Sequence, residues 1–295
     1  MTWYFLAFTS ALLSAFAAIL EKKALFKTSA LEFSLLVSLA GFIFAIPFGI
    51  NLTLDTLYST GFLVLLLKTV LNALSFYFVM SALKNLDISN SLPLMELSPG
   101  LTAIIGAIFL SEIPSKLQVL GLLFLIVGTY LINYKKGNSV SDLFSQLYKS
   151  KGHWHICLAL FIFAITSILD KVILVKFQIL PKDFIFLHHF ITLMIFSVFY
   201  LVSKHSNVST LLSVISKDKS LWILIFLVGV LSVFYRYTQI LAIKEGQVAL
   251  VLAIKRTSVF FACVIGGKIF KEETLMQRIV ATIILIIGSV LIILF

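Results

Sequence analysis

Six ionisable side chains interrupt segments of this 295-residue chain that are otherwise apolar: Lys68, Glu96, His188, Arg236, Lys255 and Arg256. In a bilayer such groups are costly, so they normally face a partner or a water-filled cavity. Arginine or lysine would there bind an anionic group, glutamate would bind an ammonium, and histidine would carry a proton near neutral pH. These residues are therefore the first candidates for a binding or coupling site.

Polar neighbours at helical spacing extend two of these positions into stripes. Lys68 shares a helix face with Asn72, and Arg236 shares one with Gln239, because residues three or four apart lie on one side of a helix. We expect Arg236 and its neighbour Tyr235 to line a pocket, although packing or an aromatic belt is the commoner role for such a tyrosine. For Lys68, a place in the cavity and snorkelling toward the nearer interface have equal weight.

Glu96 and Arg256 occupy matching positions in the two copies of an internal repeat described below. Together they would bind a zwitterion, with Arg256, beside Lys255, holding a carboxylate and Glu96 an ammonium. The alternative is that Glu96 and Arg256 pair with each other and lock one conformation. The sequence leaves both interpretations open.

A second repeated pair combines acidic and basic residues. Glu21 in ILEKKALFK matches Asp170 in ILDKVILVK at an offset of 149 residues. We interpret Glu21 and Asp170 as gating or structural residues in preference to substrate contacts, with proton coupling as a related role. His188 is a further candidate for proton transfer, against the commoner alternative of a hydrogen-bonded histidine at the interface.

The composition places all these residues in a membrane protein. Apolar residues make up 60% of the chain, charged residues only 12%, and the mean hydropathy is +1.10. A soluble domain of this size needs about a quarter charged residues to cover its surface. Ten apolar segments are long enough to span a bilayer or nearly so; they lie at 3–26, 31–50, 61–83, 88–110, 116–133, 154–177, 184–203, 221–243, 247–269 and 275–295.

The net charge of +10 does not indicate a nucleic-acid partner, because most lysines and arginines lie in short gaps between apolar segments. The two cysteines, Cys157 and Cys263, both lie within apolar segments, and no metal-ligand spacing or nucleotide-binding loop is present. We therefore expect no metal, no cofactor and no enzymatic activity. The expected partners are a small-molecule substrate, the lipid bilayer, and a coupling proton or counter-substrate.

The chain repeats itself. Residues 77–132 align without a gap with residues 237–292 at an offset of 160. We expect a first unit at 1–133, a connecting loop at 134–153 and a second unit at 154–295. Each unit holds five segments, and an odd number of spans inserts the second unit the other way up. The predicted fold is all-α, with ten transmembrane helices in two inverted five-helix repeats, an architecture typical of secondary transporters.

The repeat ending resembles that of the EamA family in the drug/metabolite transporter superfamily. In ALKNLDISNSLPLMELSPGLTAIIGAIFLSEIPSKLQVLGLLFLIVGTYLI, the resemblance rests on Pro99, Glu112, Gly121 and Gly128. The second copy has Glu272 and Gly288, but Val259 stands where the proline would be. The resemblance implies alternating access, a central cavity and a substrate among metabolites, amino acids or drugs.

Lysine and arginine concentrate in the gaps that follow odd-numbered segments. The positive-inside rule then predicts a multi-pass protein of the cell (inner) membrane with the loop at 134–153 in the cytoplasm and both termini outside. The resemblance implies the opposite, with cytoplasmic termini. The functional hypothesis is a secondary transporter of a small anionic or zwitterionic metabolite, driven by exchange or proton coupling. The alternative is a flippase for an amphiphilic or lipid-linked substrate.

Overall fold

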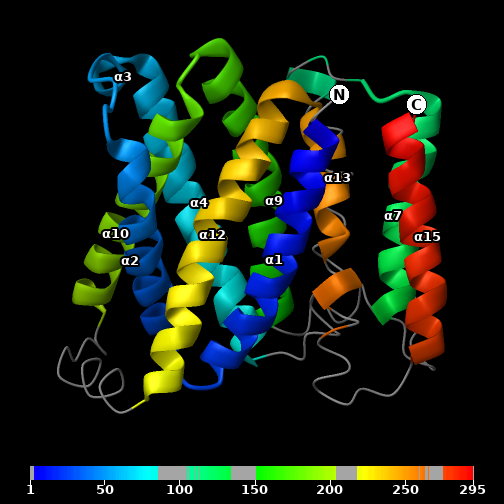
Figure 1. Ribbon diagram of the computed structural model, residues 1–295, viewed down its shortest axis with the longest axis horizontal. Coiled ribbons are helices and arrows are strands. Elements are labelled where there is room, and N and C mark those ends of the chain that lie inside the picture. The colour runs from blue at the N-terminus through cyan, green and yellow to red at the C-terminus, as the bar shows by residue number, and fades with distance from the viewer. Residues whose placement is uncertain are drawn as a thin grey trace.

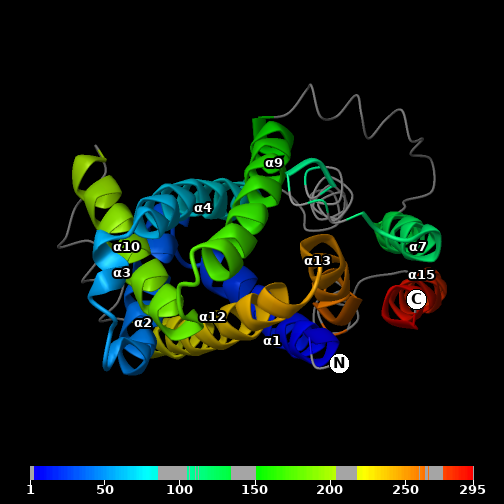
Figure 2. The same ribbon diagram turned by 90° about the horizontal axis from the view of Figure 1, so that it is seen from above.

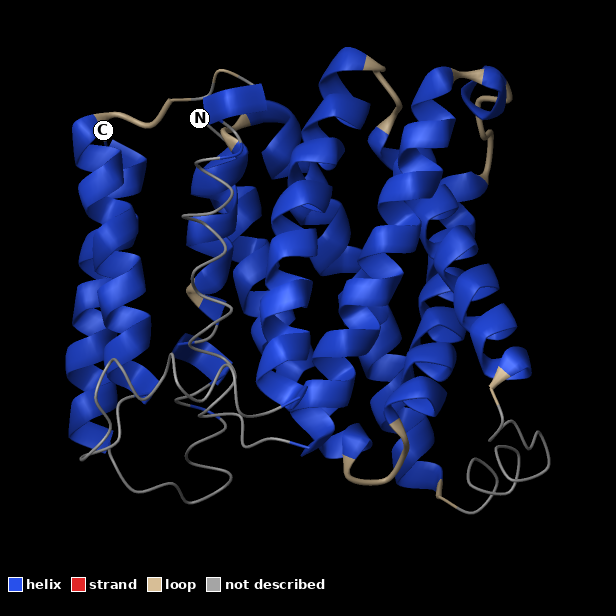
Figure 3. Ribbon diagram, turned by 180° about the vertical axis from the view of Figure 1, so that it is seen from behind, coloured by secondary structure: helices blue, strands red, loops and turns tan. Residues whose placement is uncertain are grey.

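A computed structural model describes residues 3–85, 105, 107–109, 111, 113–133, 151–203, 218–258, 260–262, 265 and 275–294. These residues form helices and the turns that link them, with no strand among them (Figure 3). The helices are α1 (Trp3–Leu25), α2 (Ala30–Gly49), the short α3 (Asp55–Tyr58), α4 (Thr60–Asn85), α7 (Lys116–Asn133), α9 (Lys151–Lys171), the π-helical turn η1 (Val172–Lys176), α10 (Pro181–Val202), α12 (Lys219–Glu245), α13 (Val248–Arg256) and α15 (Leu275–Leu294).

Six of the described helices are long and apolar enough to cross a membrane, namely α1, α2, α4, α9 with η1, α10 and α12. Shorter apolar stretches lie within α7 and α15. These elements agree closely with the segments expected from the sequence. The expected segment at 88–110 lies almost entirely outside the described residues, so the number of ten spans stays a prediction.

Local signals in the sequence set where several helices begin. Ser29 and Glu32 form a capping box at the start of α2, in which each side chain accepts a hydrogen bond from the other residue's backbone N–H. Asp218 caps α12 by accepting from the backbone N–H groups of Ser220 and Leu221. Pro181 occupies the first turn of α10, where its missing N–H costs nothing. These caps place the helix ends on the two faces of the bundle.

Helices α1 and α4 run in the opposite direction to α2, and α10 runs opposite to α12, while the two ends of the chain lie on the same face (Figure 1). We call this the terminal face. It also carries α3 and the connection between α9 and α10. The opposite face carries the turn between α1 and α2 and the start of α12, and we call it the loop face. From above, α7 and α15 stand side by side at one edge of the bundle (Figure 2).

The packing follows the internal repeat. Under the sequence alignment, α1 corresponds to α9, α2 to α10, α4 to α12 and α7 to α15. In the structure α1 packs along α12, and the matching pair α9 and α4 packs in the same way; α2 packs on α10, and α7 packs on α15. Each contact thus maps onto another or onto itself when the two halves are exchanged. This is the packing expected of a two-repeat transporter fold.

The contact between α7 and α15 shows this exchange at the level of single residues. Gly121 meets Gly288, and Gly128 meets Ala281. At the repeat offset of 160, Gly121 is equivalent to Ala281 and Gly128 is equivalent to Gly288. Exchanging the two halves therefore turns one contact into the other. The two helices run in opposite directions (Figure 1). A local twofold axis between the two helices relates the two contacts.

Candidate functional site

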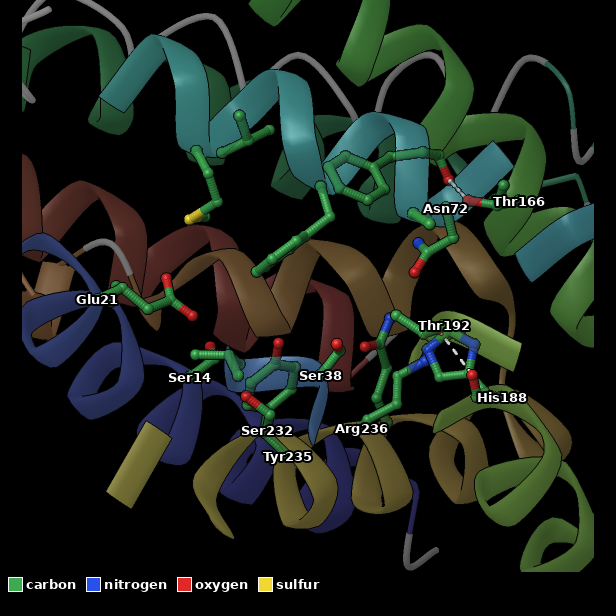
Figure 4. A pocket seen from close by; sticks show the side chains of 18 of the residues that line it. Ser14, Glu21, Ser38, Asn72, Thr166, His188, Thr192, Ser232, Tyr235 and Arg236 are labelled. Atoms are coloured by element: carbon green, nitrogen blue, oxygen red, sulfur yellow. Dashed lines mark hydrogen bonds between the residues drawn. The ribbon is translucent and has the colours of Figure 1, made fainter. Parts of the chain in front are cut away.

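A cavity of about 300 Å³ lies in the middle of the bundle (Figure 4). Seven described helices contribute to its wall: α1, α2, α4, α9, α10, α12 and α13. Hydroxyl and amide side chains form one part of the lining, and these are Ser14, Ser34, Ser38, Asn72, Thr166, Ser167, Thr192, Ser232, Gln239 and Ser258. Apolar side chains form another part, and they include Phe76, Val79, Met80, Phe163, Phe196 and Leu252.

The ionisable residues of the cavity are separated along its length. In Figure 4, Glu21 lies toward one end of the cavity, whereas Arg236 and His188 lie toward the other. Glu21 is near the loop-face end of α1, and Met80 is near the same end of α4. The arginine end is nearer the terminal face. The cavity therefore has one end rich in positive charge and one end with a carboxylate.

Behind the arginine end lies a buried cluster of three charges. Arg236 donates a hydrogen bond to Asp170 Oδ2 over 2.7 Å, from α12 to α9. Lys68 Nζ on α4 lies 3.1 Å from Asp170 Oδ1, within ion-pair distance but without hydrogen-bond alignment. The side chains of Lys68 and Asp170 are 0% and 1% exposed. One acidic side chain thus lies between two basic side chains away from solvent.

Phe184 covers this cluster. Its ring centroid lies 4.8 Å from Lys68 Nζ and 5.7 Å from Arg236 Cζ, so both basic groups contact the same aromatic ring. Phe184 is itself fully buried on the first turns of α10. Together with the salt bridges, it joins α4, α9, α10 and α12 on the terminal side of the cavity. These buried contacts lie between the cavity and the terminal face.

Two further cations lie on α13. Lys255 Nζ donates to Gln239 Oε1 over 2.6 Å and lies 4.7 Å from the centroid of the Tyr235 ring. Arg256 lines the cavity beside it and is partly buried. Lys255 is therefore held against α12 by a hydrogen bond and a cation–π contact. Both side chains can present positive charge to a ligand.

The histidine pair on α10 forms part of the wall. His188 Nδ1 lies 3.4 Å from Thr69 Oγ1, and that hydroxyl donates its proton to the carbonyl of Leu65. The nitrogen must therefore carry the proton if it bonds to Thr69, which leaves Nε2 of His188 as an acceptor. His189 Nε2 is buried and has no hydrogen-bond partner among the described residues. The pair offers polar nitrogen atoms beside Arg236.

Glu21 lies in a different environment from Asp170, its partner in the repeat. The carboxylate lines the cavity and forms no direct ion pair with any described residue. One helical stripe holds Ser10, Ala17 and Glu21, and Ser10 donates to the carbonyl of Tyr235 over 2.8 Å. Helices α1 and α12 pack closely against each other along this stripe.

The structure brings most of the candidate residues to one place. Those that line the cavity are Glu21, Asn72, His188, Tyr235, Arg236, Lys255 and Arg256. Lys68 and Asp170 lie behind Arg236, outside the lining. Lys68 neither snorkels nor faces the cavity, because its contact with Asp170 holds it in the interior. Glu96 lies outside the described residues.

Sequence reasoning missed several residues of the site. Phe184 carried no signal, since it is one of 28 phenylalanines in the chain. Thr69 stands beside Lys68 in the sequence, but its contact with α10 depends on packing. Ser34 and Ser38 on α2 are spaced four apart and both line the cavity. That spacing is a helical stripe and was sufficient to predict them.

Comparison with known proteins agrees with this architecture. The sequence model of the EamA-like transporter family matches residues 1–134 and again residues 150–294. Two copies of one family unit therefore cover nearly the whole chain. The chain belongs to the EamA-like transporter family. It is a multi-pass membrane protein of the drug/metabolite transporter superfamily, whose EamA members are transporters rather than enzymes.

One solved structure, described as the crystal structure of a protein, has a similar fold with a TM-score of 0.75. The match covers 98% of this chain and 96% of that chain at 15% sequence identity. At this identity the likeness shows the fold alone. Comparison with curated proteins gave no significant match.

Proposed function

We propose that this protein is a secondary transporter that carries a small anionic or zwitterionic metabolite across the cell membrane by alternating access. This proposal rests on the excess of basic over acidic residues in the cavity and directly behind it. Arg236, Lys255 and Arg256 line it against one described carboxylate, Glu21, while Lys68 and Asp170 lie directly behind. Four basic groups thus stand against two acidic groups in this described set, and two of the basic groups are arginines, which keep their charge in a low-dielectric interior. An anionic ligand compensates for that surplus.

The arginine end of the cavity suits a carboxylate or phosphate. A guanidinium presents N–H groups in a planar fork that matches two oxygens of such a group. Arg236 uses one terminal nitrogen on Asp170, and its Nε is buried without a hydrogen-bond partner among the described residues. Lys255 and Arg256 add charge on the neighbouring helix. The acidic head of the substrate binds here.

The rest of the lining suits the body of a small metabolite. The volume of the cavity is at the lower end of the range for small-molecule sites. Hydroxyl groups such as Ser14, Ser38 and Ser232 offer hydrogen bonds, while Phe76 and Met80 offer apolar contact. A zwitterion would place its ammonium toward Glu21, the opposite end from Arg236. Glu96, matched to Arg256 in the repeat, stays a second candidate for that ammonium.

A ligand screen tests this proposal. The purified protein is heated with amino acids, organic phosphates, nucleosides or quaternary amines, because a ligand of the folded state raises the melting temperature. Carboxylates or phosphates should raise it, whereas quaternary amines without an acidic group should not. A stabilisation confined to cations or nucleosides would contradict the anionic substrate class.

Transport in proteoliposomes follows for the best ligand of the screen. Lipid translocation measured in the same vesicles addresses the alternative of a flippase. Movement of a labelled amphiphile, without uptake of any soluble ligand, would favour the flippase and reject the metabolite carrier.

A further inference from the structure

Glu21 and Asp170 hold the same position in the two halves but have opposite surroundings. Asp170 is enclosed by Lys68 and Arg236, and Glu21 faces the cavity without a direct ion pair to any described residue. The cause lies in the helices that pack against them. Asp170 on α9 faces α4 and α12, and Glu21 on α1 faces the matching helices α12 and α4.

The offset of 160 extends without a gap through α4 and α12, so it identifies the counterparts of the two cations. Lys68 corresponds to Val228, and Arg236 corresponds to Phe76. Neither counterpart carries a charge. The half of the molecule that contains Glu21 therefore lacks the two cations that neutralise Asp170.

In an inverted-repeat transporter, alternating access is largely a rocking of one repeat against the other around a fixed site. We infer that the second conformation exchanges the arrangements of the two halves. In this structure Asp170, Lys68 and Phe184 are buried on the terminal side, and we take this side as the closed one. In the exchanged state, the loop side closes around Glu21 in the same way, between Val228 and Phe76. A charged carboxylate buried between two apolar side chains is strongly disfavoured.

We propose that Glu21 takes up a proton from the loop-face solution whenever that side closes, so that Glu21 makes the conformational change dependent on protonation. This inference deepens the proposed function, since it assigns the coupling ion of the same cavity. The carboxyl group binds the proton while the cavity is open to the loop face. It releases the proton after the cavity has opened to the opposite side.

Helices α12 and α13 bring ionisable groups close to Glu21. We expect none of these groups to neutralise the Glu21 carboxylate in place of a proton. From α12 it meets Tyr235, and from α13 it interacts with Lys255. Lys255 is held to the second half by Gln239 and by the Tyr235 ring. The lining residues of α2 and α4 on this side are uncharged, namely Ser34, Val37, Ser38, Phe76, Val79 and Met80. Protonation is the simplest way to neutralise the carboxylate.

Closure of the loop side can be measured without knowing the substrate. Phe26 at the end of α1 and Trp154 at the start of α9 are both exposed near the loop face. Spin labels at Phe26→Cys and Trp154→Cys, with Cys157 and Cys263 replaced by Ser, report the distance across this face in sodium-free vesicles. A short distance between the two labels corresponds to a closed loop side. The fraction of molecules with this short distance should rise as the pH falls from about 8 to about 5.

The Glu21→Gln variant should hold the short-distance population at its acidic level at every pH, because the amide mimics the protonated acid. Asp55→Asn is the control variant and should keep the pH response, because Asp55 is exposed and outside the cavity lining. His188→Gln and His189→Gln test the two histidines of the cavity wall as alternative pH sensors, and they should also keep the response. Retention of the full pH response in Glu21→Gln would overturn the proposal. Loss of the pH response in either histidine variant would also overturn the proposal. So would a change of the short-distance population caused by sodium at fixed pH.

Lys255→Met tests whether a lysine replaces the proton. If Lys255 neutralises Glu21 in the closed state, removal of Lys255 creates a pH response that the parent protein lacks, and the proposal fails. The ligand screen separates this inference from the proposed function. If Glu21→Gln lost binding of carboxylate ligands, Glu21 would be a binding residue for the ammonium group of the substrate. The proposal that Glu21 binds the coupling proton would then be rejected. Absence of any carboxylate ligand, with the pH response intact, would reject only the proposed substrate class.

Discussion

Gly121 and Gly288 face each other where α7 crosses α15, and a Cβ added to either would lie 2.8 Å from the carbonyl oxygen of the other. The two backbones meet directly at this point. Small residues at such crossings allow close helix association in membranes, where lipid offers apolar helices no hydrophobic drive to associate. Neither position therefore tolerates a side chain without moving the helices apart.

Gly288→Leu should lower the stability of the protein by about 1–3 kcal/mol or more, since the added side chain meets backbone that cannot yield. Thermal unfolding in detergent measures the loss. Val290→Leu is the matched control, because Val290 lies on the same helix and is 44% exposed. An equal effect of the two substitutions would mean that the crossing is not the cause.

Removal of Asp170 should destabilise the protein more than removal of either cation. Asp170→Asn leaves two buried positive groups uncompensated, for which a loss of about 3–5 kcal/mol is typical. Lys68→Met in the same background removes one of them and should restore part of the loss. The melting temperatures of the single and double variants test this coupling. Additive effects would contradict a shared cluster.

Arg256→Ala should abolish uptake of an acidic substrate while the protein remains folded. Arg256→Lys keeps the charge but loses the planar fork, so we expect intermediate uptake. Initial rates in proteoliposomes and melting temperatures are measured together. Lys244→Ala is the control, since Lys244 is an exposed cation outside the cavity lining. Unchanged uptake in Arg256→Ala would remove this residue from the site.

A salt bridge on the loop face gives a pH-dependent prediction. Lys27 Nζ lies 2.6 Å from Asp218 Oδ2, and hydrogen bonds from Lys27 and Ser220 lower the pKa of Asp218 to about 2. A carboxyl whose pKa falls on folding stabilises the protein above its usual pKa of 3.8, and this contribution disappears as the pH falls through about 2.

The difference in melting temperature between the parent and Asp218→Asn should therefore be constant from neutral pH to about pH 4. It should then shrink toward pH 2. Added salt should reduce it throughout, because both side chains are exposed. A difference that grows on acidification would contradict the assignment.

Much of the architecture followed from the sequence because bilayers restrict a chain to few solutions. Apolar length predicted the spans, and helical spacing put Asn72 and Arg236 on polar helix faces, both of which line the cavity in the structure. The charged pairs were harder to predict. Lys68 and Asp170 are 102 positions apart, and their contact depends on how α4 crosses α9. Glu21 and Asp170 look equivalent in sequence, and only the packed neighbours Val228 and Phe76 separate their environments.

The π-helical turn η1 follows Asp170 and Lys171 directly, and Phe177 N–H bonds to the carbonyl of Val172 to close it. The matching stretch after Glu21 continues as α-helix to Leu25. A π turn is a costly local irregularity that persists where it has a role. We therefore expect the conformation closed on the terminal face and the conformation closed on the loop face to differ in free energy. Without a gradient, we expect unequal occupancy of the two conformations. Under equal and opposite substrate gradients, we expect unequal initial rates of transport in the two directions.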